Sequence, residues 1–133
     1  GFESYCRSKQ VPYEMLRLDD GAEEVQFQDF FRSHIKDGRL DIDGIFCSTD
    51  FLACRIRTML EELELRVPED VQIIGFDGLR QFGTGELFCS TIIQPVQKIA
   101  ETSVDLLLAK DRSNIPALVC LPVSYASGGT TRE

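Results

Sequence analysis

The hydrophobic pattern between Ile45 and Asp77 changes twice and predicts a strand, a helix and a second strand. Apolar residues within positions 42–48 form the first short run. Apolar residues then recur at helical spacing over positions 50–65, with charged residues between them. Pro68 ends this helix because proline forces the preceding residue away from helical angles, and positions 71–76 form a second β-rich run. The pattern therefore predicts a βαβ unit.

Polar residues follow both predicted strands, Thr49 and Asp50 after the first and Asp77 at the end of the second. Two strands joined by one helix lie parallel, so their carboxyl ends meet at one edge of the sheet, where open α/β sheets bind ligands. A hydroxyl and two carboxylates there suit a polyhydroxyl ligand, because an ionised aspartate accepts hydrogen bonds from hydroxyl groups. The alternatives are structural: Thr49 or Asp50 caps the helix, and Asp77 with Gly78 forms a turn.

The remaining pattern predicts a doubly wound parallel sheet of the α/β class, because two helical crossovers follow one another. The helix at positions 2–9 has no strand before it, so the sequence is expected to begin inside a domain. Asp19–Asp20–Gly21 is predicted to be a turn, and Gly38 the C-cap of a helix. The further elements that we predict are helices 22–37 and 95–110, strands 13–18, 91–93 and 117–123, a loop at 79–87 and a polar connection at 111–116.

Composition limits the classes of function. The chain has 133 residues, 43% of them hydrophobic, which is enough for one domain with a core. Its net charge of -8 argues against direct contact with nucleic acid, because binding to phosphates depends on clustered Lys and Arg. If the intact protein binds DNA, another segment must carry the basic surface.

The sequence offers little for catalysis or metal binding. The five cysteines are odd in number and include no C-x-x-C pair, so we predict free thiols in a reducing cytosol. The sequence has no G-x-S-x-G motif, glycine-rich phosphate loop or metal triad, and His34 is predicted to be an ordinary surface or satisfied side chain. We therefore predict no enzyme activity, catalytic residue, metal or cofactor. No apolar run reaches the roughly 18 residues that a membrane span needs.

Three segments carry a resemblance to a known family. STDFLACRIRTMLEELELRVPEDVQIIGFDG at positions 48–78, STIIQPVQKIAETSVDLLL at 90–108 and LPVSYASGGTT at 121–131 resemble the effector-binding core of LacI-family (LacI/GalR) bacterial transcription regulators. The resemblance implies a Rossmann-like, periplasmic-binding-protein-like fold in which a ligand lies between two subdomains. It also implies that positions 1–94 form an incomplete C-terminal subdomain and that 95–123 belong partly to the other subdomain. Positions 124–133 are expected to be a polar tail that frays.

The same resemblance implies ligand contacts by Thr49, Asp50, Asp77 and Gln94. Thr49 stands where the family usually has asparagine, so the bidentate amide is replaced by a hydroxyl. The implied ligand is a small effector, with a sugar favoured on family grounds, and it would control operator binding by an upstream helix-turn-helix headpiece in a cytoplasmic protein.

The family also implies a homodimer, to which the loop after Asp77 contributes. Its apolar residues either form dimer contacts or cover the sheet edge; they are Leu79, Phe82, Leu87 and Phe88. The alternative function is a stand-alone periplasmic sugar-binding protein of the same fold. About sixty further residues upstream would distinguish these hypotheses, by showing either a helix-turn-helix or a signal peptide.

Overall fold

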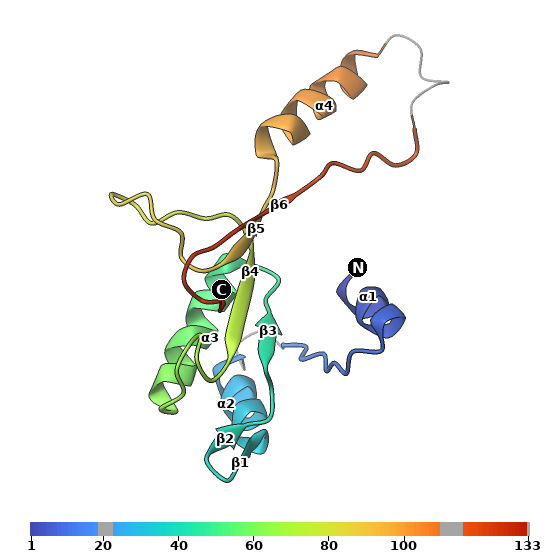
Figure 1. The fold of residues 1–133 in the computed structure, drawn as a ribbon. Helices are drawn as coiled ribbons and strands as arrows, with labels where there is room; N and C mark the ends of the chain where they lie inside the picture. Colours follow the sequence, from blue (N-terminus) through green and yellow to red (C-terminus); the bar gives the residue numbers. More distant parts are fainter. Residues whose placement is uncertain (19–22, 110–115, 133) are drawn as a thin grey trace. The chain divides into compact units, whose positions relative to one another are not determined.

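The computed structural model describes residues 1–18, 23–109 and 116–132 (Figure 1). The chain divides into two compact units, Gly1–Ser33 and His34–Glu133. The second unit contains the main sheet and all four predicted ligand contacts. The predicted turn at positions 19–21 lies outside the described residues, as does nearly all of the predicted connection at 111–116.

The first unit contains helices α1 (Phe2–Lys9) and α2 (Glu23–Ser33). The prediction of α1 is confirmed, but the strand predicted at positions 13–18 is wrong. A strand needs a neighbouring strand for its backbone hydrogen bonds, and none occurs among the described residues of this unit. Instead, the Tyr13 hydroxyl donates to the Glu3 carboxylate at 2.9 Å and accepts from Arg7 Nε at 2.8 Å.

A short hairpin opens the second unit. Strands β1 (Ile35–Lys36) and β2 (Arg39–Leu40) pair antiparallel, so the helix predicted to reach position 37 ends earlier, at Ser33. Asp37 and Gly38 at the turn have φ of 51° and 74°, and positive φ at both central residues is the signature of a tight hairpin turn. The prediction of Gly38 as a helix C-cap is therefore wrong: it is a turn residue.

The main sheet has the strand order β3 (Gly44–Phe46), β4 (Gln72–Asp77), β5 (Thr91–Ile93) and β6 (Ser124–Ala126) (Figure 1). The first three strands are parallel and β6 is antiparallel to β5. Helix α3 (Asp50–Glu62) connects β3 to β4. The predicted βαβ unit, and with it the parallel α/β class, is confirmed.

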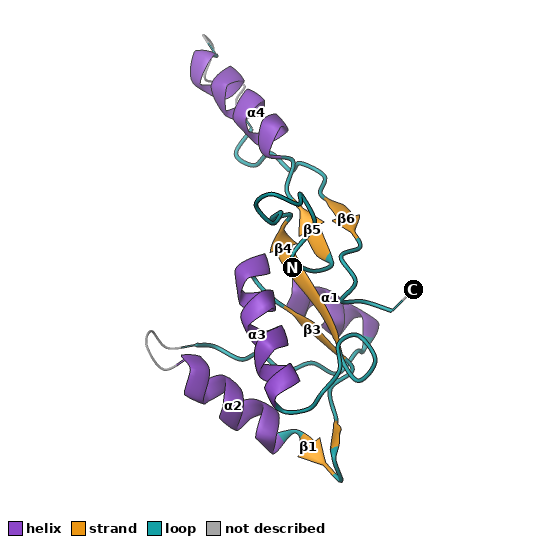
Figure 2. Cartoon of the chain, turned by 90° about the vertical axis from the view of Figure 1, so that its left-hand side faces the viewer, coloured by secondary structure: helices purple, strands orange, loops and turns teal. Residues whose placement is uncertain are grey.

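Helix α3 covers one face of the sheet (Figure 2). Its buried side chains recur at helical spacing and are Ala53, Ile56, Met59 and Leu60. Val71, just before β4, and Ile73, within it, are fully buried, and α3 contacts this strand. Burial of such aliphatic side chains stabilises a fold by about 1.5 to 3 kcal/mol each, so this layer is the core of the second unit.

The end of the chain is ordered against the sheet. The strand predicted at positions 117–123 is wrong, because the strand is β6 at Ser124–Ala126. The expectation of a fraying tail is also wrong: Thr130 is 1% exposed and its hydroxyl donates to the Ile73 carbonyl at 2.7 Å. The same hydroxyl accepts from the Ser90 amide at 2.8 Å, so the terminal segment ties β4 to the residue before β5.

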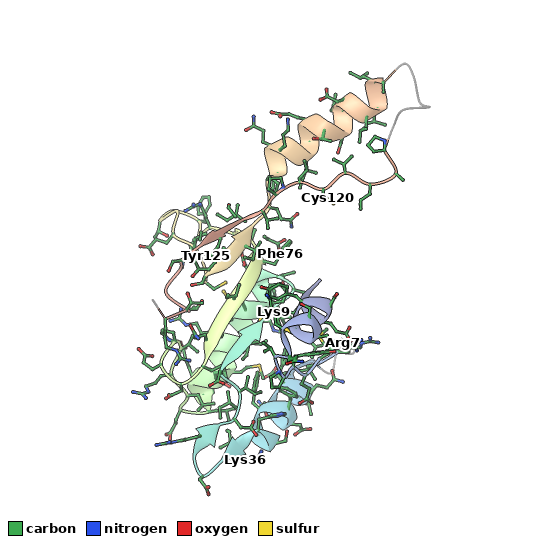
Figure 3. The ribbon with its side chains drawn as sticks, turned by 45° about the vertical axis from the view of Figure 1, so that its right-hand side comes forward. Arg7, Lys9, Lys36, Phe76, Cys120 and Tyr125 are labelled. Carbon is green, nitrogen blue, oxygen red and sulfur yellow. The ribbon has the colours of Figure 1, made fainter. Side chains whose placement is uncertain are left out.

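Helix α4 (Val96–Leu108) lies beyond β5 at the end of the sheet away from β1 and β2, and none of its residues is buried (Figures 1 and 2). Residues 116–123 run beside it, and Figure 3 labels Cys120 on this segment. Between them is a cavity of about 370 Å³, lined by Phe76, Gln94, Pro95, Ile99, Thr102, Ser103, Leu106, Val119, Leu121 and Val123. None of the helices in the described ranges is long and apolar enough to cross a membrane.

Candidate ligand site at the carboxyl ends of the parallel strands

The register of the sheet brings the predicted residues to one edge. Phe46 of β3 pairs with Ile74 of β4, and Thr49 and Asp77 each stand three residues further along the chain. Asp77 pairs with Ile93 of β5, and Gln94 follows directly. The expectation that parallel strands end at a common edge is therefore confirmed for β3, β4 and β5.

Asp77 and Gln94 form a hydrogen-bonded pair across the ends of β4 and β5. The Gln94 side-chain amide donates to Asp77 Oδ1 at 2.7 Å, and both residues are partly exposed. A carboxylate has about four acceptor positions, and a single amide N–H occupies one of them. The pair therefore keeps acceptor oxygens, from Asp77 and from the Gln94 carbonyl, for the hydroxyl groups of a ligand.

The backbone at Asp77 is strained. Its φ is 127°, a region that side-chain-bearing residues rarely adopt and that costs on the order of 1 to 3 kcal/mol. Gly78 continues the turn with φ of 82°, and a Cβ there would lie 2.9 Å from Cγ1 of Ile93. The turn is thus packed tightly against β5. Strain that the surroundings maintain at a strand end is typical of functional sites.

Thr49 is the N-cap of α3. Its φ of -146° and ψ of 157° are extended, and its Oγ1 accepts from the Leu52 amide at 3.1 Å. Of the two caps that the sequence left open, the structure thus selects Thr49. Because a hydroxyl is both donor and acceptor, Thr49 retains a proton to donate at the edge of the sheet.

Asp50 lies beneath the edge. It is 0% exposed, and its carboxylate accepts from the Leu79 amide at 2.6 Å and from the Thr91 hydroxyl at 2.5 Å. Gly75 provides the space, because a Cβ there would lie 2.2 Å from Asp50 Oδ1. This burial corrects the expectation that Asp50 lies open at the edge beside the other three candidates.

The cysteines near this site are neutral thiols. Burial raises the pKa of Cys47 and of Cys89 to about 12, and all five cysteines of the chain are free. The described residues include no group of three His, Cys, Asp or Glu side chains that could hold a metal ion.

Comparison with known proteins identifies the class to which this fold and edge belong. The family model of the periplasmic binding protein-like domain matches residues 1–131. The chain belongs to this family, and it is similar to the corresponding part of LacI-family regulators.

Three relatives show the likeness. The sucrose operon repressor of Streptococcus mutans is 37% identical over 87 residues, 65% of this chain and 27% of that protein. The sucrose operon repressor of Pediococcus pentosaceus is 26% identical over 140 residues, 98% of this chain and 40% of that protein. A LacI family transcriptional regulator from Enterococcus faecium, solved with bound ribose, has a TM-score of 0.62 at 28% identity, covering 98% of this chain and 49% of that one. The chain thus spans well under two thirds of the length of these relatives.

Proposed function

We propose that this chain is the ligand-sensing part of a LacI-type transcriptional repressor and that its effector is a sugar. The sugar binds at the carboxyl edge of β3, β4 and β5, where Asp77 and Gln94 accept from its hydroxyl groups and Thr49 donates to it. The observation that carries the proposal is the Asp77–Gln94 hydrogen bond on a strained strand end. Each hydrogen bond to the carboxylate contributes about 1.5 to 3 kcal/mol.

The chemistry of the relatives supports a sugar. The Enterococcus faecium regulator holds ribose, and two of the curated relatives are named for a sucrose operon. A sugar presents many O–H donors on a small frame, which matches an edge rich in acceptor oxygens. The walls of the site would be completed by the first subdomain of the intact protein.

Control of transcription would pass through a DNA-binding segment outside this chain. A net charge of -8 makes these 133 residues a poor partner for phosphates, so the operator contacts belong to a basic headpiece in a cytoplasmic protein. Coupling of about 1 to 3 kcal/mol between effector and operator sites changes operator affinity severalfold or more.

We also propose a homodimer formed through the loop after β4. Leu79 and Phe88 are exposed there, and Phe82 is fully exposed. An isolated bridge between Arg80 and Leu87 closes the loop into a hairpin-like form. Exposed apolar residues concentrated in one loop support a protein interface there.

A thermal-shift assay on the intact protein tests the ligand site. At a sugar concentration of about one hundred times Kd, binding stabilises the native state by about 2.7 kcal/mol, so ribose or sucrose should raise Tm. Asp77→Ala should abolish this shift because it removes the acceptor for the sugar. The unliganded protein should still fold, because Asp77 is partly exposed. Asp70→Ala, which removes a partly exposed carboxylate before the opposite end of β4, should leave the shift intact. An unchanged shift in Asp77→Ala would show that Asp77 is only a turn residue.

A further inference from the structure

Two successive backbone amides behind Asp77 are held by one buried polar cluster. The Gly78 amide donates to Thr91 Oγ1 at 3.2 Å, and the Thr91 hydroxyl donates to Asp50 Oδ1 at 2.5 Å. The Leu79 amide donates to the other oxygen of Asp50 at 2.6 Å. Asp50 and Thr91 therefore fix the two residues that immediately follow the strained Asp77.

This cluster is completely enclosed. Asp50 and Thr91 are each 0% exposed, and the neutral Cys89 thiol lies 3.6 Å from Asp50 Oδ1. Asp50 also occupies the first turn of α3, where the positive end of the helix dipole stabilises a negative charge. Burying a carboxylate costs free energy unless hydrogen bonds satisfy it. Here the Leu79 amide of the turn and the Thr91 hydroxyl of β5 are the two donors. An enclosed polar cluster therefore supports the turn that follows Asp77.

We propose that Asp50 and Thr91 are positioning residues, which hold the Asp77 backbone at positive φ so that its carboxylate faces Gln94 and the ligand. The inference rests on the function proposed above and assigns these two residues a role in affinity rather than in contact. Without the Thr91 hydroxyl, the Gly78 amide loses its partner and Asp77 can relax toward an ordinary backbone angle. The carboxylate would then turn away from Gln94 Nε2. The oxygens of Asp77 and Gln94 would no longer lie close enough together to accept from one sugar.

Thr91→Val tests the proposal, with Thr130→Val as the matched control. Both threonines are buried, and the hydroxyl of each joins two polar groups, but Thr130 binds the Ile73 carbonyl and the Ser90 amide instead of the Asp77 turn. Both variants should lower Tm, because each leaves buried polar groups unpaired. Only Thr91→Val should weaken binding of ribose or sucrose to the intact protein, by about tenfold or more, while Thr130→Val stays within about twofold. Thr91→Ser, which keeps the hydroxyl, should restore the affinity.

A second measurement does not depend on the sugar. In the intact protein labelled with ¹⁵N-glutamine, the Gln94 side-chain amide should give a resonance shifted by its hydrogen bond to Asp77. This signal should move toward the position of a solvent-exposed amide in Thr91→Val and in Asp77→Ala, and stay in place in Thr130→Val.

The outcomes separate the two proposals. If Asp77→Ala loses binding but Thr91→Val retains both the wild-type affinity and the Gln94 resonance, the positioning role is overturned and the ligand site stands. If Thr91→Val and Thr130→Val weaken binding equally, the cluster acts only on stability and the positioning role is likewise rejected. If Asp77→Ala binds sugar like the wild type, the proposed function itself fails, whereas the Gln94 resonance still decides whether Thr91 orients Asp77.

Discussion

Helices α3 and α4 have the same length, 13 residues, and both carry apolar residues at helical spacing, yet they differ in burial. Helix α3 buries Ala53, Ile56, Met59 and Leu60 together with Asp50, whereas α4 buries no residue. Each helix contains seven apolar residues. The comparison teaches that periodicity predicts an apolar face, whereas burial requires a partner surface, which the sheet supplies only to α3.

The candidate site lies where these two regions join. Thr49 begins α3, Asp77 ends β4, and Gln94 precedes α4 by one proline. Buried hydrogen bonds of Asp50 hold the region on the α3 side. The region on the α4 side has few contacts, and none of the residues of α4 is buried. The candidate site thus lies between a well-packed part of the second unit and a sparsely packed one.

The largest expected difference between the regions is in stability. Leu60→Ala on α3 removes a side chain that is 0% exposed and should lower the free energy of unfolding by about 2 to 5 kcal/mol. Leu107→Ala on α4 removes one that is 74% exposed and should change it by less than about 0.5 kcal/mol in this chain. Urea denaturation of the 133-residue chain followed by circular dichroism measures both. Equal losses would mean that α4 packs against the chain in solution.

Cysteine reactivity should separate the same regions. Cys47 and Cys89 lie in the sheet core with pKa values raised to about 12 by burial, while Cys120 is exposed beside α4. Because the thiolate is the nucleophile, a disulfide reagent at about pH 8 should modify Cys120 at least about tenfold faster than either buried thiol. Mass spectrometry after timed quenching gives the rates, and Cys120→Ser should remove the fast component. Comparable rates for Cys89 and Cys120 would contradict the packing of Asp50 and Cys89.

The smallest effect concerns two exposed carboxylates. Hydrogen bonds from the Arg66 side chain and amide hold the pKa of Asp70 at about 2, and on α4 bonds from Gln97 and Lys98 lower the pKa of Glu101. Because the folded pKa of Asp70 lies below its ordinary value, its stabilisation is present above about pH 4 and is lost as pH falls toward 2. Arg66→Gln should therefore lower Tm slightly at neutral pH, and the difference from wild type should shrink as the solution is acidified.

An NMR titration of the carboxyl carbons checks the origin of this effect. The midpoint of Asp70 should rise toward its ordinary value in Arg66→Gln, while that of Glu101 stays unchanged because Arg66 is not among its partners. If the Asp70 midpoint is unaltered by the substitution, the ion pair with Arg66 does not form in solution.

The sequence predicts the βαβ unit well because its signals are local. Helical spacing and the apolar run of β4 each act over a few residues, and the structure confirms both. The prediction that Pro68 ends the helix is wrong, because α3 already ends at Glu62 and Glu64 has a positive φ of 61°. The Asp37–Gly38 pair is also a local signal, because this dipeptide is typical of hairpin turns. The apolar residues before it continue the helical spacing, so the pattern predicts a longer helix than the structure has. Strand β6 and the docked Thr130 could not be predicted, because small polar residues become buried only through partners such as Ile73, 57 positions away.

The same distinction applies to the site. Asp77 was predictable because the parallel order of two strands dictates the edge at which it lies. The burial of Asp50 was not, since its donors Leu79 and Thr91 are 29 and 41 positions distant. The sequence alone places both Asp50 and Asp77 at this edge, with Asp50 also a candidate helix cap. Packing separates them into one that is enclosed and one that remains available.

Gln94 connects the end of β4 to the start of α4 over a short distance along the chain. Its side-chain amide donates to the Asp77 carboxylate, and the next two positions are Pro95 and the first residue of α4. Any tilt of α4 about this proline pulls directly on the hydrogen bond at the strand end. A change at the hydrogen bond between Gln94 and Asp77 would therefore reach α4 within two peptide links, without passing through the core.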